Sequence, residues 1–345
     1  MDLFVLSGLG VGAVFGYALQ RGRFCMNSAA RDSLLLRDFT MLKAVGVAIL
    51  VQLIGFAILD ATGIQAIAPK PFFLAANLVG SFTFGIGMVL AGACASGLSY
   101  RTGEGLVSAM VAAVGLTAGA LFAAGGGFLN PTVASLQANP AKVGEANMTL
   151  ANLFGIPYYI LALGIAIVAI VLWVWLGKPF SLESTTAKTK AAKGTSHGWG
   201  WMVTGLVIGL IAVVAFPLSV AAGRVGPIGI TDGWLGIYKA IFAGGAWTFA
   251  PLFILGLIVG AFVAAILNKE FKFRVPSIGM LVQVLIGGLL MGFGAVCSGG
   301  CNITHILGGL PMLAVSSIVA TIAVLAGAWL TAYLIFNVFR KSPAA

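Results

Sequence analysis

Nine long apolar runs restrict what this chain can fold into. A helix needs about 20 mostly apolar residues to cross the roughly 30 Å hydrocarbon core of a bilayer. Only 8% of the 345 residues are charged and 60% are hydrophobic, whereas about 25% of the residues of an ordinary soluble protein are charged. The sequence therefore predicts an all-α polytopic membrane protein with about nine transmembrane helices. The runs cover approximately residues 3–20, 41–59, 73–95, 105–125, 156–177, 200–221, 248–267, 277–298 and 311–338.

Two weaker stretches, 24–36 and 227–245, are interrupted by glycine, proline or polar residues. We interpret them as short re-entrant elements or half-helices, because irregular backbone at membrane depth has to be shielded by protein. The chain also contains 48 glycines, and small residues allow membrane helices to approach closely.

The basic residues are distributed unevenly between the two sides of the membrane. Fifteen of the 19 Lys and Arg residues fall on one side, and the other side receives Lys70, Lys142, Arg224 and Lys239. Under the positive-inside rule the C-terminus is expected in the cytoplasm and the N-terminus outside. The net charge of +10 is thus interpreted as a topology signal, and no nucleic-acid partner is expected. The polar segment 178–198 is interpreted as a flexible cytoplasmic linker.

Two glycine-rich blocks indicate an internal repeat. The sequence GMVLAGACASGLSYRTGEGL at 87–106 resembles GLLMGFGAVCSGGCNITHILGGL at 288–310 when Cys94 is aligned with Cys297. Each block closes one apolar run and precedes the next. A repeat of this length predicts two related halves of the chain.

The repeat divides the chain into three parts. Residues 1–126 form a first repeat of four spans, residues 127–198 hold the fifth span and the linker, and residues 199–345 form a second repeat of four spans. Because the fifth span carries the chain across the membrane once more, the second repeat is expected to be inverted relative to the first. Inverted repeats place substrate sites near the midplane, where discontinuous helices meet.

Few residues are available for catalysis. The sequence contains no HExxH motif, no GxxxxGK[ST] motif, no paired carboxylates, and only the histidines His197 and His305. The usual groups for ATP hydrolysis and for hydrolytic or redox chemistry are therefore missing. We expect a transporter rather than an enzyme, with no cofactor and no bound metal.

The four cysteines lie at glycine-rich breaks. Cys25 follows RGRF, Cys94 lies in GACASG, and Cys297 and Cys301 lie in AVCSGGC. Glycine lets the backbone break and a ligand approach, and the amides exposed at such breaks favour anions. Thiols would suit either a soft metal ion or a sulfur-containing anion held weakly by neutral S–H groups. The single Cys-x3-Cys spacing, with no second pair, favours the anion.

The chain resembles the YeeE/YedE family of bacterial inner-membrane proteins, and in particular its thiosulfate-uptake members. The resemblance rests on QRGRFCMNSAARD at 20–32, AGACASG at 91–97 and GAVCSGGCNITH at 294–305. It extends over the full length, with two related halves and a similar number of spans. The three cysteine-bearing blocks together are fairly specific.

The resemblance implies uptake of thiosulfate from the periplasm for sulfur assimilation, through a tightly packed protein in the lipid bilayer. By motif, Cys25, Cys94 and Cys297 would relay the ion through S–H hydrogen bonds. It also implies a small cytoplasmic TusA-like sulfur-handling partner.

Five further residues near the cysteines are assigned an accessory part in the substrate path. They are Cys301, Gln20, Asn27, Asn302 and His305.

Three alternative functions stay open. They are import of a selenium or other sulfur species, a sulfurtransferase with a Cys persulfide, and a thiolate metal channel.

Overall fold

The computed structural model describes residues 3–143, 146–176 and 198–339. Most of the linker expected at 178–198, and His197 with it, lie outside the described residues. Within them the regular structure is helical apart from one hairpin of two short strands, β1 (Lys142–Val143) and β2 (Ala146–Asn147). The expected all-α class is thereby confirmed.

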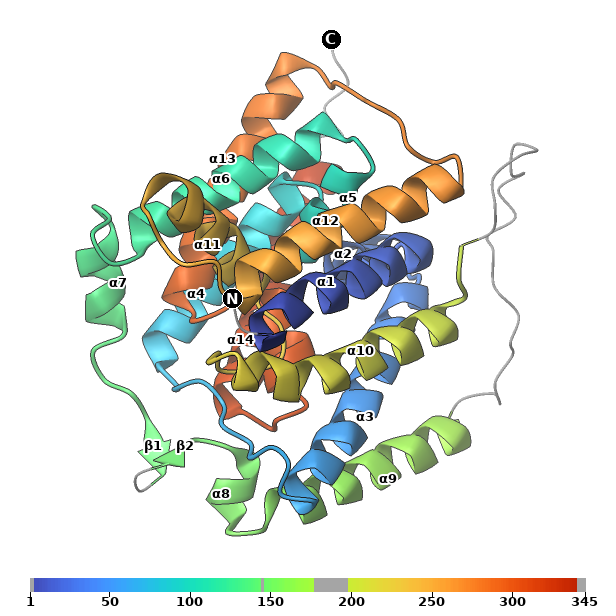
Figure 1. Cartoon of the computed structure of the whole chain (residues 1–345), viewed down its shortest axis with the longest axis vertical. Coiled ribbons are helices and arrows are strands. Elements are labelled where there is room, and N and C mark those ends of the chain that lie inside the picture. Colours follow the sequence, from blue (N-terminus) through green and yellow to red (C-terminus); the bar gives the residue numbers. More distant parts are fainter. Residues whose placement is uncertain (1–2, 144–145, 177–197, 340–345) are drawn as a thin grey trace.

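Each of the nine apolar runs contains a long helix in the described part of the chain (Figure 1). By length and composition, eight helical segments could cross a membrane, and α6, with 17 residues, is a shorter apolar helix. The polytopic membrane protein expected from the sequence is therefore confirmed. The long helices are α1 (Leu3–Gly22), α3 (Thr40–Ala61), α4 (Leu74–Leu90), α6 (Val107–Ala123), α9 (Tyr158–Leu176), α10 (Trp201–Ala221), α12 (Phe249–Leu267), α13 (Ile278–Cys297) and α14 (Val315–Tyr333).

Short helices follow several of the long ones. The two weak stretches form α2 (Met26–Leu35) and α11 (Ile230–Phe242), as expected. Two further short helices, α5 (Ala95–Gly103) and the π-helix η1 (Ile303–Gly309), were not anticipated as separate elements. The remaining short helices are α7 (Asn130–Leu136), α8 (Leu150–Phe154) and η2 (Leu334–Phe339).

Glycine explains the close packing of α1 against α12, which lie side by side in Figure 1. A Cβ atom at Gly12 or Gly16 would overlap the backbone carbonyl of Phe253 or Leu257, respectively. The two helices therefore approach until backbone meets backbone, as small residues permit in membranes.

The relative directions of the helices bear on the expected inverted repeat. The residue numbers of contacting positions in α1 and α12 increase in the same direction, so these two helices run parallel. The same holds for α3 and α10. In contrast, Gly80 of α4 meets Gly294 of α13, whereas Gly87 meets Gly287, so these two helices are antiparallel. Parallel pairs of non-equivalent helices and an antiparallel pair of equivalent ones are what inverted halves require. The boundaries of the repeats stay a prediction.

The backbone aligns the two cysteine-bearing blocks differently from the sequence alignment. Helix α4 ends at Leu90 and α13 at Cys297. Two residues after each end a glycine has positive φ, +72° at Gly92 and +82° at Gly299, and two residues later come Cys94 and Cys301. The structural counterpart of Cys94 is therefore Cys301, and the alignment of Cys94 with Cys297 is displaced by about one helical turn.

Candidate functional site

Three cysteines lie where short helices begin. Cys25 is the N-cap residue of α2 and Cys94 that of α5, and Cys301 immediately precedes Asn302, the N-cap residue of η1. All three side chains are buried and belong to one cluster of buried residues. The chain breaks its helices before Cys94 and Cys301 because Gly92 and Gly299 adopt a left-handed backbone that other residues rarely adopt.

Cys25 and Cys94 form a direct sulfur–sulfur contact. Their Sγ atoms lie 3.6 Å apart, a hydrogen-bonding distance for two free thiols. The Cys94 sulfur also accepts a hydrogen bond from the Gly97 amide at 3.3 Å and lies 3.3 Å from the Ser96 hydroxyl. The thiol thus performs the capping task that Ser or Thr usually performs at a helix N-terminus.

Gly97 makes room for this pair. A Cβ atom there would lie 3.0 Å from the Cys25 sulfur and 3.3 Å from the Cys94 sulfur. Such distances are shorter than ordinary van der Waals contacts. The first turn of α5 therefore needs glycine for both thiols to reach it.

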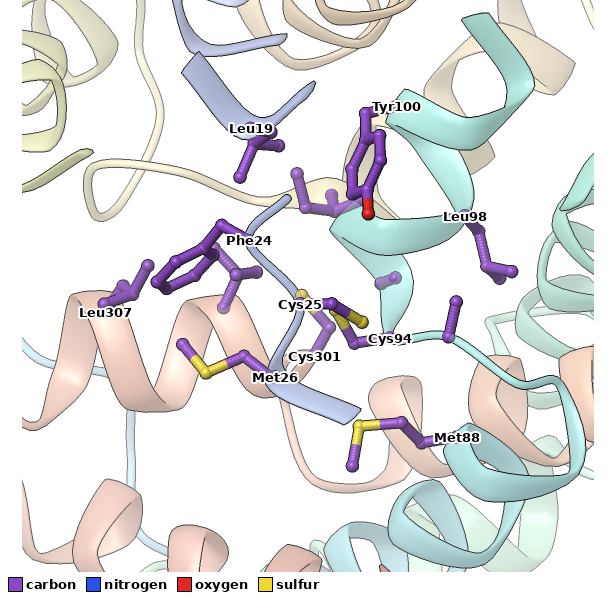
Figure 2. Close-up of a cluster of buried hydrophobic side chains, with 14 of the residues drawn as sticks. Leu19, Phe24, Cys25, Met26, Met88, Cys94, Leu98, Tyr100, Cys301 and Leu307 are labelled. Atoms are coloured by element: carbon purple, nitrogen blue, oxygen red, sulfur yellow. The ribbon is translucent and has the colours of Figure 1, made fainter. Parts of the chain in front are cut away.

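Cys301 completes this group. Figure 2 draws its side chain with Cys25 and Cys94, among the thioethers of Met26 and Met88. The Cys301 sulfur lies 3.6 Å from the Thr304 hydroxyl. We name Cys25, Cys94 and Cys301 the thiol cluster.

Cys297 lies elsewhere. It is fully buried in a separate cluster with Ala76, Ala123 and Val133, and its Sγ atom points to the Ala76 carbonyl oxygen at 3.7 Å. The structure therefore brings two of the three expected relay cysteines together and adds Cys301, which the sequence placed in an accessory position.

Two of the accessory residues carry unsatisfied polar atoms next to the thiol cluster. Both Asn27 and Asn302 are buried. Among the described residues, the Asn27 Oδ1 atom and both side-chain polar atoms of Asn302 have no hydrogen-bond partner. Buried polar groups are usually paired, so these amides have free capacity for a polar ligand or water.

His305 and Gln20 have other partners. The His305 ring contacts the Ser317 hydroxyl at 3.1 Å and the Ser298 carbonyl at 3.2 Å. The Gln20 amide nitrogen donates to Glu104 at 3.3 Å and to Glu270 at 2.5 Å, while its buried Oε1 atom has no hydrogen-bond partner among the described residues. Both side chains therefore connect neighbouring segments of the chain through hydrogen bonds.

A small cavity lies beside η1. Its free interior of about 20 Å³ has room for roughly one water molecule. Because Thr304 lines this cavity and its hydroxyl lies 3.6 Å from the Cys301 sulfur, the cavity adjoins the thiol cluster. An oxyanion would need the lining to move. The lining includes Lys70, Pro227, Thr304, His305, Gly308 and Ser317.

Sequence reasoning missed Ser96, Gly97 and Tyr100. All three are buried in α5 near the thiols. Only the position of the helix break after Gly92 would have pointed to them, since it turns the next residues into a first helical turn.

Buried thiols without disulfide bonds, at the broken helices of a polytopic membrane protein, define a membrane transporter more readily than an enzyme. Comparison with protein families agrees: residues 21–330 match the model described as sulphur transport. The chain belongs to this family, the YeeE/YedE family, as its sequence suggested.

Individual relatives carry more specific names. The chain is 38% identical over 342 residues to the thiosulfate transporter TsuA of Spirochaeta thermophila, covering 96% of this chain and 99% of that one. It is 32% identical over 346 residues to the thiosulfate transporter TsuA of Escherichia coli K12, covering 97% and 96%. The probable transporter YedE of the same organism matches at 33% over 91 residues, which is 26% of this chain and 23% of YedE.

Proposed function

We propose that this protein imports thiosulfate across the bacterial inner membrane for sulfur assimilation. The full-length relatives named thiosulfate transporters support the substrate. The uneven distribution of Lys and Arg supports a periplasmic N-terminus and a cytoplasmic C-terminus.

The thiol cluster supplies successive weak sites for the ion. The terminal sulfur of thiosulfate is a soft, polarizable acceptor, and neutral thiols are weak donors to it. With Cys25 and Cys94 in contact at 3.6 Å, an arriving sulfur replaces one S–H···S hydrogen bond with another. Weak binding at each step lets the ion leave as well as enter.

Cys301 is the third member of the relay in this proposal, in place of Cys297. The reason is position: Cys301 shares the buried cluster of Cys25 and Cys94, whereas Cys297 packs against α4. The free amide of Asn302 beside Cys301 offers a donor to the oxygen atoms of the ion.

A small TusA-like protein is the proposed cytoplasmic acceptor of the imported sulfur. The proposal rests on the family resemblance. Co-purification of the full chain with such a protein, from cells supplied with thiosulfate, tests it; absence of any complex would remove the partner from the account and leave transport untouched.

The contact between Cys25 and Cys94 is the observation that carries the proposal. We would measure uptake of labelled thiosulfate in cells that lack their own sulfate and thiosulfate importers. The native chain is expected to support uptake and Cys94→Ala to abolish it. Cys94→Ser is the sharper variant, because a hydroxyl preserves the cap on the Gly97 amide and removes only the sulfur.

Three outcomes separate the alternatives. Uptake by Cys94→Ser equal to that of the native chain would show that the thiol is only a cap. Stronger competition by selenite or sulfite than by unlabelled thiosulfate would move the substrate to another species. A mass increase of the purified chain by one sulfur atom would indicate a persulfide and a sulfurtransferase.

A further inference from the structure

Arg101 takes an unusual course along α5. It lies in the last turn of this helix, seven residues after Cys94, a rise of about 10 Å in an α-helix. Its side chain nevertheless turns back, and Nη1 donates to the carbonyl oxygen of Gly92 at 3.1 Å. Because Gly92 lies two residues before Cys94, the guanidinium lies at the level where α5 begins.

Tyr100 fixes this orientation. Arg101 Nε donates to the Tyr100 hydroxyl at 3.3 Å, and the guanidinium lies 5.8 Å from the centre of the ring. Tyr100 is buried in the same cluster as the thiols, and Figure 2 shows its hydroxyl directed toward Cys25 and Cys94.

The charge of Arg101 is not neutralised by a direct partner. None of the ion pairs among the described residues includes it. Its nearby acid, Glu104, binds the amide of Gln20 instead. Of the five N–H donors of a guanidinium, two have partners in the described part of the chain.

A purely structural role for Arg101 would require only one hydrogen bond. The Gly92 carbonyl, left open by the break after α4, is satisfied by any single N–H donor. The guanidinium therefore keeps three donors that no group in the described part of the chain uses, and its nitrogen atoms are not among the fully buried unsatisfied ones, so an anion arriving from water can reach them.

We propose that Arg101 binds the sulfonate end of thiosulfate while Cys25 and Cys94 hold its terminal sulfur. This rests on the proposed function and deepens it by making the site two-ended. The planar fork of arginine matches two oxygens of an oxyanion. The site therefore selects species that combine an exposed sulfur with an oxyanion, and rejects sulfur species that lack the oxyanion.

The test uses the full chain in proteoliposomes, with labelled thiosulfate and the KM and maximal rate measured separately. Arg101→Gln keeps a side-chain N–H donor and removes the charge, and its KM is expected to rise roughly ten- to a hundred-fold. Arg101→Lys restores the charge without the fork and should recover part of the loss. Arg37→Gln is the matched control, because Arg37 is an exposed loop residue.

The outcomes distinguish this inference from the proposed function. No uptake by the folded native chain would overturn the proposed function itself. Uptake by the native chain with an unchanged KM in Arg101→Gln would overturn the role of Arg101 and leave the thiol relay standing.

A measurement on the native chain covers the case in which Arg101 variants do not fold. Sulfate carries the oxyanion without the terminal sulfur, and hydrosulfide carries the sulfur without the oxyanion. The two-ended site predicts that sulfate inhibits thiosulfate uptake competitively at a lower concentration than hydrosulfide does. The opposite order would overturn the inference.

Discussion

Replacing Gly97 by alanine tests whether the spacing of the two thiols matters. The new Cβ would lie 3.0 Å from the Cys25 sulfur, 3.1 Å from the Ala93 Cβ and 3.3 Å from the Cys94 sulfur. Overpacking of this kind costs about 1–3 kcal/mol, and the higher helix propensity of alanine returns about 1 kcal/mol. The net loss of about 0–2 kcal/mol leaves the protein folded, while the sulfurs must move apart.

Thiosulfate uptake and thermal unfolding should therefore respond differently to Gly97→Ala. Loss of one hydrogen bond worth about 1 kcal/mol slows passage of thiosulfate by roughly five-fold. The unfolding temperature is expected to change only slightly. The control is Gly10→Ala in α1, where a Cβ would meet nothing within 4 Å. Full uptake by a folded Gly97→Ala variant would refute the argument that the two sulfurs must stay in contact.

Two further predictions concern stability. Gly12→Ala should lower the unfolding temperature in detergent because its Cβ would overlap the Phe253 carbonyl, and an effect as small as that of Gly10→Ala would contradict backbone contact between α1 and α12. Burial raises the pKa of Glu104, so the folded protein binds this proton more tightly than the unfolded chain, and stability declines as pH rises above about 4. Glu104→Gln should therefore unfold at increasingly higher temperature than the native chain as pH rises; a difference independent of pH would contradict this.

Much of the fold follows from composition and periodicity. Runs of about 20 apolar residues predict membrane helices because a helix satisfies its own backbone hydrogen bonds in lipid. The same reasoning located α2 and α11, since their polar and glycine residues interrupt the hydrophobic pattern. It did not identify α5, because the glycine-rich and polar residues Ala95–Gly103 fall between two predicted apolar runs and read as a connection, and only the backbone turn at Gly92 shows that they begin a new helix.

The thiol cluster was predictable only in part. Cys25 and Cys94 are each the single cysteine at a break in the helical pattern, so the sequence was sufficient to assign them to the site. Cys297 and Cys301 are four residues apart in a glycine-rich segment, about one helical turn, and a sequence alignment can use either. The backbone decides between them, because Gly299 adopts a left-handed conformation similar to that of Gly92 and thereby directs the chain from the end of α13 to Cys301.

The central claim is that Cys25, Cys94 and Cys301 pass the ion between them. The most direct test compares thiosulfate uptake by Cys301→Ala and Cys297→Ala, two identical substitutions at buried sites four residues apart. We predict that Cys301→Ala abolishes uptake and that Cys297→Ala retains most of it. Loss of uptake in Cys297→Ala with retention in Cys301→Ala would contradict the thiol cluster as the path of the ion.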